Sequence, residues 1–292
     1  MSLCSSLIFK VATAIDNSSR QRLCLLIDNG SVLPGPTLHL RRVARALEIQ
    51  IGCTVHALSL LHSNKVDSGY LQGSPAELLE PVLNEMLMAG QREFVIVPQF
   101  FGPSRALSSY VPSIIERLLK NWPDAQFHLA SCLYDKKDNS ANLIAGILED
   151  RLLDDSLDGA IDGRSIILVD HGTPVVEVNQ VRHAVAAELG ERLGKPVIAS
   201  SMERRSGAEY DFNEPLLESV LERPELESVI VSLLFFSEGR HAGPDGDIFK
   251  ICEASSADRI SIARPIGMHP SLIQLLARRY HEALPYRHSL TS

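Results

Sequence analysis

The chain carries an internal repeat, because short motifs of its first half recur in the same order in its second half. Residues 27–31 read Ile-Asp-Asn-Gly-Ser, and residues 169–173, 142 positions later, read Val-Asp-His-Gly-Thr. Each copy follows a short apolar run and precedes a segment with helical periodicity. The two copies differ at Asn29 and His171, and an imidazole binds transition metals and exchanges protons near neutral pH whereas an amide does neither well. The repeat predicts two similar lobes, with chemistry kept in the second.

Apolar, β-rich runs alternate with amphipathic segments along both halves. The central runs 94–97 and 229–234 are almost wholly apolar, which is typical of parallel strands covered by helices on both faces. Each half reads β-α-β-α-β-α-β-α and predicts an α/β fold of two similar lobes, each an open parallel four-stranded sheet flanked by helices, with a cleft between them. The expected strands are 23–27, 54–60, 94–98, 126–130, 165–169, 196–201, 228–235 and 259–263, and the expected helices are 37–49, 75–88, 109–119, 139–153, 176–193, 214–221, 245–254 and 270–283.

The predicted boundary between the lobes is the acidic, glycine-bearing stretch 153–164. We expect an N-terminal extension at 1–21, a first lobe at 22–155 and a second lobe at 164–285.

Composition excludes several functional classes. The net charge is −8 and no Lys/Arg run occurs, which argues against a nucleic-acid partner. No apolar run approaches the roughly 18 residues that cross a membrane, and no secretory signal is evident, so we expect a cytoplasmic protein with no membrane partner. A transit peptide to a plastid stays an open alternative for a photosynthetic source. The five cysteines form no CxxC motif, and no GxGxxG or P-loop occurs, which argues against zinc-ribbon, iron–sulfur and nucleotide sites.

A second histidine-bearing loop follows the strand expected at 228–235. It includes Phe235, Phe236, Arg240 and His241, and its counterpart in the first half reads Phe-Phe-Gly-Pro-Ser-Arg-Ala at 100–106, again without the imidazole. Glu203 follows the neighbouring strand and has no acidic counterpart. Ligands of open α/β sheets bind beyond the carboxyl ends of the strands. We therefore expect His171, His241 and Glu203 to meet at one edge, as an open divalent-metal site or as proton acceptors.

The His-Gly-Thr turn, the Phe-Phe-x-x-Gly-Arg-His loop and the sequence Gly-Met-His-Pro at 267–270 resemble the class II tetrapyrrole chelatases. More narrowly, the chain over about residues 22–285 resembles a CbiX/SirB-type sirohydrochlorin chelatase in a two-repeat long form, with a degenerate first repeat. The resemblance implies insertion of Co²⁺ or Fe²⁺ into a sirohydrochlorin-type tetrapyrrole, in cobalamin or siroheme biosynthesis. Ni²⁺ fits the same ligands, and no cofactor beyond this substrate metal ion is implied.

The resemblance also assigns residues. It implies that His171 and His241 bind the metal and act in catalysis with Glu203. Because such a substrate is rich in carboxylates, Arg240, Arg204 and Arg205 are candidate substrate-binding residues, although the last two also fit ordinary surface charges.

The implied partners are the tetrapyrrole and the divalent metal. A monomer is expected, because the duplication already supplies the second lobe. Two alternatives stay open: a non-catalytic metal or tetrapyrrole carrier derived from a chelatase, and an unrelated α/β ligand-binding protein.

Overall fold

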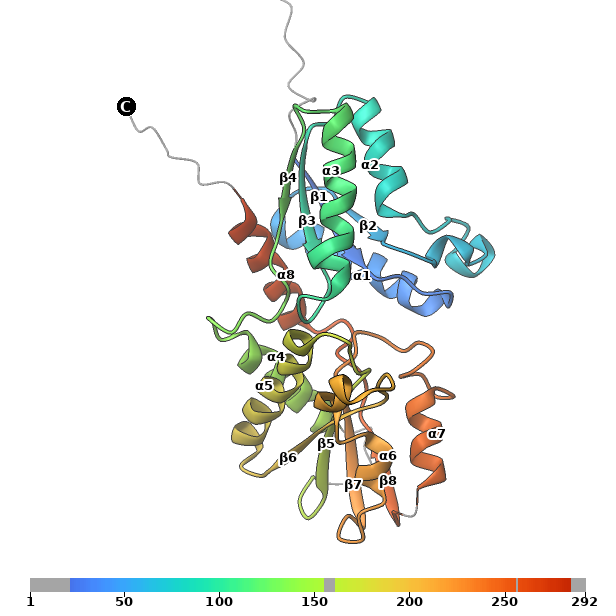
Figure 1. Cartoon of the computed structure of the whole chain (residues 1–292), viewed down its shortest axis with the longest axis vertical. Helices are drawn as coiled ribbons and strands as arrows, with labels where there is room; N and C mark the ends of the chain where they lie inside the picture. Colours follow the sequence, from blue (N-terminus) through green and yellow to red (C-terminus); the bar gives the residue numbers. More distant parts are fainter. Residues whose placement is uncertain (1–21, 155–160, 256, 285–292) are drawn as a thin grey trace, which may run out of the picture.

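The computed structural model describes residues 22–154, 161–255 and 257–284, in two lobes placed one above the other (Figure 1). The predicted extension 1–21 lies outside the described residues. The first sheet has the order β2-β1-β3-β4 and the second the order β6-β5-β7-β8, and all their strands pair in parallel. The predicted α/β fold of two four-stranded parallel sheets is confirmed. The strands are β1 (Leu23–Asp28), β2 (Val55–Ser59), β3 (Glu93–Pro98), β4 (Gln126–Leu129), β5 (Ser165–Asp170), β6 (Val197–Ser201), β7 (Ser228–Leu233) and β8 (Arg259–Ile262).

The first helix of each lobe shows the repeat most clearly. Helices α1 (Pro34–Ile51) and α5 (Val176–Leu193) each have 18 residues and end at a left-handed glycine, Gly52 or Gly194. The other helices are α2 (Leu79–Met88), α3 (Val111–Asn121), α4 (Ser140–Leu152), α6 (Leu217–Leu221), α7 (Asp247–Ala254) and α8 (Pro270–Ala283), with short turns η2 (Ser63–Lys65), η3 (Ser68–Leu71), η4 (Ala106–Tyr110) and η5 (Ala208–Asn213). Within the described ranges no helix is long and apolar enough to span a bilayer.

Two helices begin three or four residues later than the sequence predicts. The predicted starts at residues 75 and 214 are wrong, because α2 begins at Leu79 and α6 at Leu217. The residues just before each helix are extended: Leu78 bridges to Ser59 and Leu216 to Ser201, at the ends of β2 and β6. The backbone at Leu78 and Leu216 pairs with a neighbouring strand, so it cannot form the first turn of the helix that the apolar pattern predicted.

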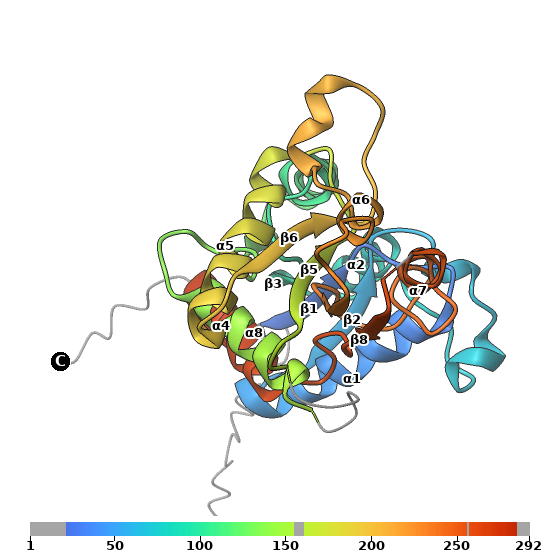
Figure 2. The ribbon, with the colours of Figure 1, turned by 90° about the horizontal axis from the view of Figure 1, so that it is seen from below.

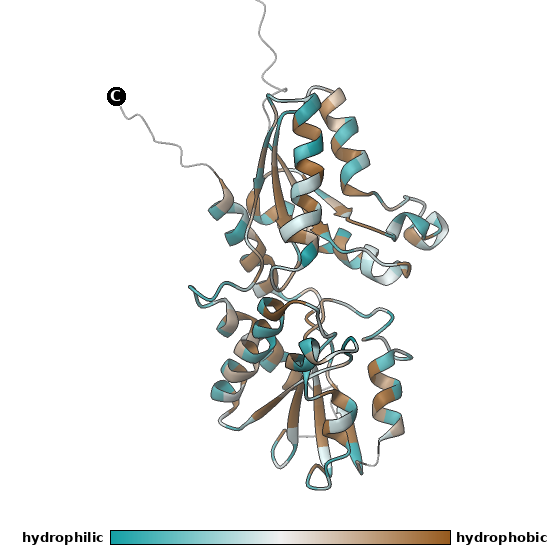
Figure 3. Cartoon of the chain, viewed as in Figure 1, coloured by the Kyte–Doolittle hydropathy of each residue, from teal (hydrophilic) through white to brown (hydrophobic). Residues whose placement is uncertain are grey.

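The hydrophobic core continues from one lobe into the other. Alternate strand residues point to opposite faces of a sheet, so Leu26 and Leu168 belong to a core that both lobes share, whereas Ile27 and Val169 belong to separate outer cores. Figure 3 shows the apolar strands at the centre of each lobe. The shared core buries the inner faces of both sheets.

The last helix of each half packs on the opposite lobe. Helix α4 follows the strands of the first sheet but contacts α5 and β7 of the second, and α8 contacts α1 and β3 of the first. The two exchanged helices also contact each other, and Figure 2 shows them side by side. The strands of one sheet thus lie within residues 23–129 and those of the other within 165–262, whereas the last helix of each half packs on the opposite sheet.

An arginine on each exchanged helix fixes it to the opposite lobe. Arg279 of α8 donates to the carbonyl oxygens of Cys132 (2.7 Å) and Leu133 (2.6 Å), which follow β4. Arg151 of α4 donates in the same way to the carbonyls of Pro265 and Ile266, which follow β8. Each exchanged helix therefore closes the loop after the edge strand of the other lobe.

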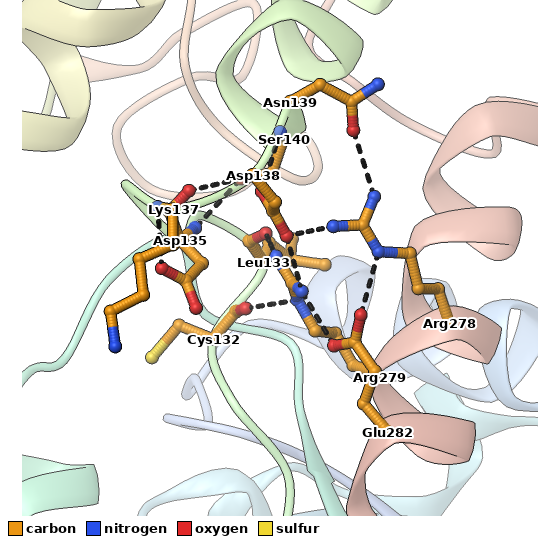
Figure 4. A network of polar contacts seen from close by, with 10 residues as sticks. All are labelled: Cys132, Leu133, Asp135, Lys137, Asp138, Asn139, Ser140, Arg278, Arg279 and Glu282. Carbon is orange, nitrogen blue, oxygen red and sulfur yellow. Dashed lines mark hydrogen bonds and ion pairs between the residues drawn. The ribbon is translucent and has the colours of Figure 1, made fainter.

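Arg279 is held in its charged form although it is buried (Figure 4). Burial opposes the charge, but hydrogen bonds to Asp138 and Glu282 outweigh it and raise the pKa of Arg279.

Candidate active site

His171 stands on a tight turn after β5. Asp170 Oδ1 accepts a hydrogen bond from the Gly172 amide at 3.1 Å. Gly172 has a φ of 90°, and a Cβ at this position would lie 1.9 Å from the carbonyl oxygen of Glu203. Only glycine fits this approach. The close packing joins the His171 and Glu203 loops, and the Glu203 amide donates to the His171 carbonyl oxygen at 3.2 Å.

Two buried polar side chains that sequence reasoning missed hold this turn. Asn213 accepts from the Thr173 amide and donates to the Thr173 carbonyl, both at 2.9 Å. Arg182 of α5 is fully buried and pairs with Asp170 at 3.1 Å. Arg182 offered a signal, since it lies on the apolar face of a periodic helix, whereas Asn213 lies in a loop without a pattern.

The three residues predicted to be catalytic come together. The rings of His171 and His241 meet edge to face, with centroids 4.6 Å apart and planes at 72°. His171 Nε2 lies 3.5 Å from Glu203 Oε1. The side chains of His171 and Glu203 are 46% and 61% exposed, so a ligand can reach them from solvent.

The neighbours of the two imidazoles leave one nitrogen of each ring available. His241 Nδ1 lies 2.7 Å from Asp247 Oδ2, and His171 Nδ1 lies 3.1 Å from the Gly172 carbonyl oxygen. Asp247 Oδ2 is an acceptor, so the His241 ring donates from Nδ1 and keeps the lone pair on Nε2. His171 has an acceptor beside each nitrogen, the Gly172 carbonyl at Nδ1 and Glu203 Oε1 at Nε2, so a metal ion bound at His171 Nε2 would lie beside the Glu203 carboxylate. Metal-binding histidines use this arrangement. Asp247 was not among the predicted site residues, although its place at the first turn of α7, six residues after His241, was a usable signal.

The three predicted substrate-binding arginines are not equivalent. Arg240 is 76% exposed beside His241, with its Nε 3.8 Å from Asp247. Arg204 is held by Asp211 at 2.9 Å and Glu214 at 2.8 Å, and the Arg205 guanidinium lies over the Tyr210 ring at 5.9 Å. Arg240 therefore lies near Asp247, the partner of His241, while Arg204 and Arg205 contact residues of their own loop.

The matching edge of the first lobe carries a buried carboxylate without a counter-charge. When the two repeats are aligned, Leu40 of α1 corresponds to Arg182 of α5, the residue that pairs with Asp170. The corresponding acid, Asp28, has an Oδ1 atom without a hydrogen-bond partner among the described residues. Burial raises the pKa of Asp28 to about 6, against hydrogen bonds from Ser59 and Gly30 that lower it.

Replacing this acid should stabilise the protein at neutral pH. The folded-state pKa of Asp28, about 6, exceeds the unfolded value of about 3.9. The native state therefore binds more protons, and stability falls as the pH rises from about 4 to 6. We expect Asp28→Asn to raise the free energy of unfolding by up to about 3 kcal/mol above pH 6, and by almost nothing below pH 4. Urea unfolding of both proteins at pH 4 and 7.5 measures this, and an equal difference at both pH values would contradict it.

Comparison with known proteins places the histidine pair in a recognised domain. Residues 165–283 match the model of the CbiX family, a span that contains His171, Glu203, His241 and Asp247. The second lobe of the chain is therefore similar to the CbiX family. No curated protein matches the chain in sequence.

Solved structures share the architecture of the whole two-lobed chain. SirB from Bacillus subtilis with Fe³⁺ is 14% identical, with a TM-score of 0.66 over 90% of this chain and 95% of SirB. The sirohydrochlorin chelatase SirB from Bacillus subtilis subspecies spizizenii in complex with cobalt is 13% identical, with a TM-score of 0.65 and the same coverage. DR2241 from Deinococcus radiodurans, described as a multi-domain protein with structural similarity to chelatases, is 14% identical, with a TM-score of 0.54 over 89% of this chain and 54% of DR2241. At these identities the likeness concerns the fold, and it extends to the first lobe, which the family model does not match.

Proposed function

We propose that this protein is a chelatase of the CbiX type, which inserts Co²⁺ or Fe²⁺ into a sirohydrochlorin-type tetrapyrrole. The observation that supports this most directly is the edge-to-face pair of His171 and His241, each with a hydrogen-bond acceptor beside Nδ1, so that Nε2 is the nitrogen to bind a metal ion. Within 22–154, 161–255 and 257–284, no group of three or more His, Cys, Asp or Glu side chains is arranged to hold a metal ion. An ion bound by two imidazoles has coordination positions left for the pyrrole nitrogens. It needs these positions because it is a substrate that is transferred to the macrocycle.

The chemistry requires proton acceptors as well as metal ligands. Insertion replaces two pyrrole N–H protons with one divalent ion, so two protons leave the macrocycle. The carboxylate of Glu203, 3.5 Å from His171 Nε2, is placed to take one, and its exposure lets it pass the proton to solvent. In this reaction the pair holds the ion against one face of the ring, while Glu203 receives protons beside it.

A turnover assay tests the proposal. Metal insertion shifts the visible absorbance bands of the macrocycle, so sirohydrochlorin is mixed anaerobically with Co²⁺ or Fe²⁺ and a small amount of protein. Many turnovers per protein molecule are expected, and the two rates compare the metals. One equivalent bound without turnover would indicate the carrier alternative, and an unchanged spectrum would contradict both functions.

Asp247 is expected to act through His241. Its carboxylate accepts from His241 Nδ1 at 2.7 Å and so fixes both the tautomer and the ring orientation. We expect Asp247→Asn to lower metal affinity or insertion rate by about 10–100-fold. Competition with a chromogenic Co²⁺ chelator gives the affinity, and Asp245→Asn on the same loop is the matched control. Equal values for the two variants would contradict this role.

A further inference from the structure

A cavity of about 440 Å³ lies between the lobes, beside the loop that carries His241. Its wall combines α1 and Arg151 of α4 with residues of two loops of the second half: Ser237, Glu238, Arg264, Pro265, Gly267 and Met268. The lobes approach closely here: a Cβ on Gly35 would lie 3.2 Å from the Glu238 carbonyl oxygen, and one on Gly239 would lie 3.3 Å from Pro36. We call this hollow the interlobe cavity.

Positive charge predominates on the wall of the interlobe cavity. Arg42, Arg151 and Arg264 line it against one carboxylate, Glu238. Arg264 is paired with Asp154, which lies outside the wall. Burial, and then the charge of Arg264, lower the pKa of Arg151. Arg42 makes no hydrogen bond or ion pair with the described part of the chain, so its guanidinium is available to an anion.

A buried imidazole without a partner lines the same cavity. His39 is 3% exposed, and its Nε2 has no hydrogen-bond partner among the described residues. Leaving a buried polar group unpaired is costly unless a ligand supplies the partner. In the alignment of α1 with α5, His39 corresponds to Val181 and Arg42 corresponds to Ala184. The first lobe therefore carries two polar groups where the second lobe has apolar side chains.

We propose that the interlobe cavity binds a carboxylate from the edge of the tetrapyrrole, through Arg42 and His39 Nε2. This rests on the proposed function, whose substrate carries carboxylates around its ring. Glu238 in the cavity wall is three residues from His241, so their Cα atoms are at most about 10–11 Å apart. A ring held at the histidine pair is thus beside the cavity. Arg204, a candidate for this task from the sequence, is already held by Asp211 and Glu214.

The test replaces both groups by their counterparts on α5. Metal-free sirohydrochlorin is titrated anaerobically into the wild type and into the His39→Val/Arg42→Ala variant, and absorbance gives the dissociation constant. Because hydrogen bonds to charged groups are lost, we expect binding to weaken about 10–100-fold. Arg45→Ala removes an exposed arginine one turn away on α1 and is the matched control, expected to bind as the wild type does.

Two further measurements test whether the group bound in the interlobe cavity is a carboxylate of the macrocycle. The fully esterified macrocycle has no free carboxylate, so it should bind the wild type and the double variant equally. In turnover, KM should rise in the double variant with kcat unchanged, as for binding shared by ground and transition states. Sirohydrochlorin binding equal to that of Arg45→Ala would overturn the proposal.

Failure of the proposed function gives a different result from failure of this inference. If the wild type neither binds nor metallates sirohydrochlorin, the proposed function is wrong, and calorimetric titration with citrate then tests the cavity itself. Citrate binding by the wild type that the double variant lacks would support a carboxylate site for a free ligand. Equal or absent citrate binding would overturn it.

Discussion

Replacing either His171 or His241 by alanine is expected to lower the rate of metal insertion by about 10²–10⁴-fold. The two rings meet at 4.6 Å, and each keeps one nitrogen available, so removing either leaves a single imidazole at the site. A single imidazole gives the ion one protein nitrogen ligand in place of two, and so holds it less firmly beside Glu203. Because the two residues act as one unit, the double variant should lose little more than either single variant.

The measurement is the anaerobic absorbance assay with Co²⁺ and with Fe²⁺. His281→Ala removes an exposed imidazole at the end of α8 and controls for general effects of histidine loss. Both site histidines are partly exposed, so circular dichroism and thermal unfolding should match the wild type. Insertion rates within threefold of the control for both single variants would show that the pair has no role in catalysis.

Replacing Arg279 by alanine is expected to have the largest effect on stability, about 3–5 kcal/mol. Its guanidinium donates to the Cys132 and Leu133 carbonyls and to the carboxylates of Asp138 and Glu282 (Figure 4). Its loss leaves buried acceptors without a donor, and each unsatisfied carbonyl costs about 1–3 kcal/mol. Because α8 belongs to the second half and these carbonyls to the first, the substitution should weaken the joining of the lobes.

Arg278 provides a matched control on the same helix. It contacts the same two carboxylates, Asp138 and Glu282, but does not reach the buried carbonyls. Because it forms an ion pair near the surface, Arg278→Ala should cost only about 0–1 kcal/mol. Urea unfolding curves of the two variants give the difference. Equal losses would mean that the carboxylates, and not the exchanged contact with the opposite lobe, account for the stability.

The repeat in the sequence was sufficient to predict the lobes. The spacing between residues 27–31 and 169–173 returns in the structure as two sheets of the same strand order. Strand ends agree within two residues, because an apolar run between polar turns is a local signal. Helix starts at 75 and 214 were wrong because a bridge to the neighbouring strand, a non-local contact, holds those residues extended.

The residues of the candidate site also fall into two groups, those that the sequence predicted and those that only the structure showed. His171, Glu203 and His241 follow strands β5, β6 and β7, which pair in register, so the sequence alone predicted their meeting at one edge. It did not indicate that Asn213 holds the His171 turn or that Asp247 orients His241, since each depends on how loops fold back on one another.

What the sequence by itself determined is the two-lobed α/β architecture and the lobe that carries the imidazoles, because hydrophobic period and residue type are properties of neighbouring positions. Only the tertiary structure decided which lobe each terminal helix stabilises, because the sheet that covers its apolar face is distant in the sequence: α4 packs on the second lobe and α8 on the first. It also decided that Arg182 pairs with Asp170, whereas Asp28 has no arginine partner in the part of the chain that the structure describes, because Leu40 occupies the position that corresponds to Arg182. Burial and pairing of charge depend on the whole fold, and they set both the pKa of Asp28 and the shape of the site.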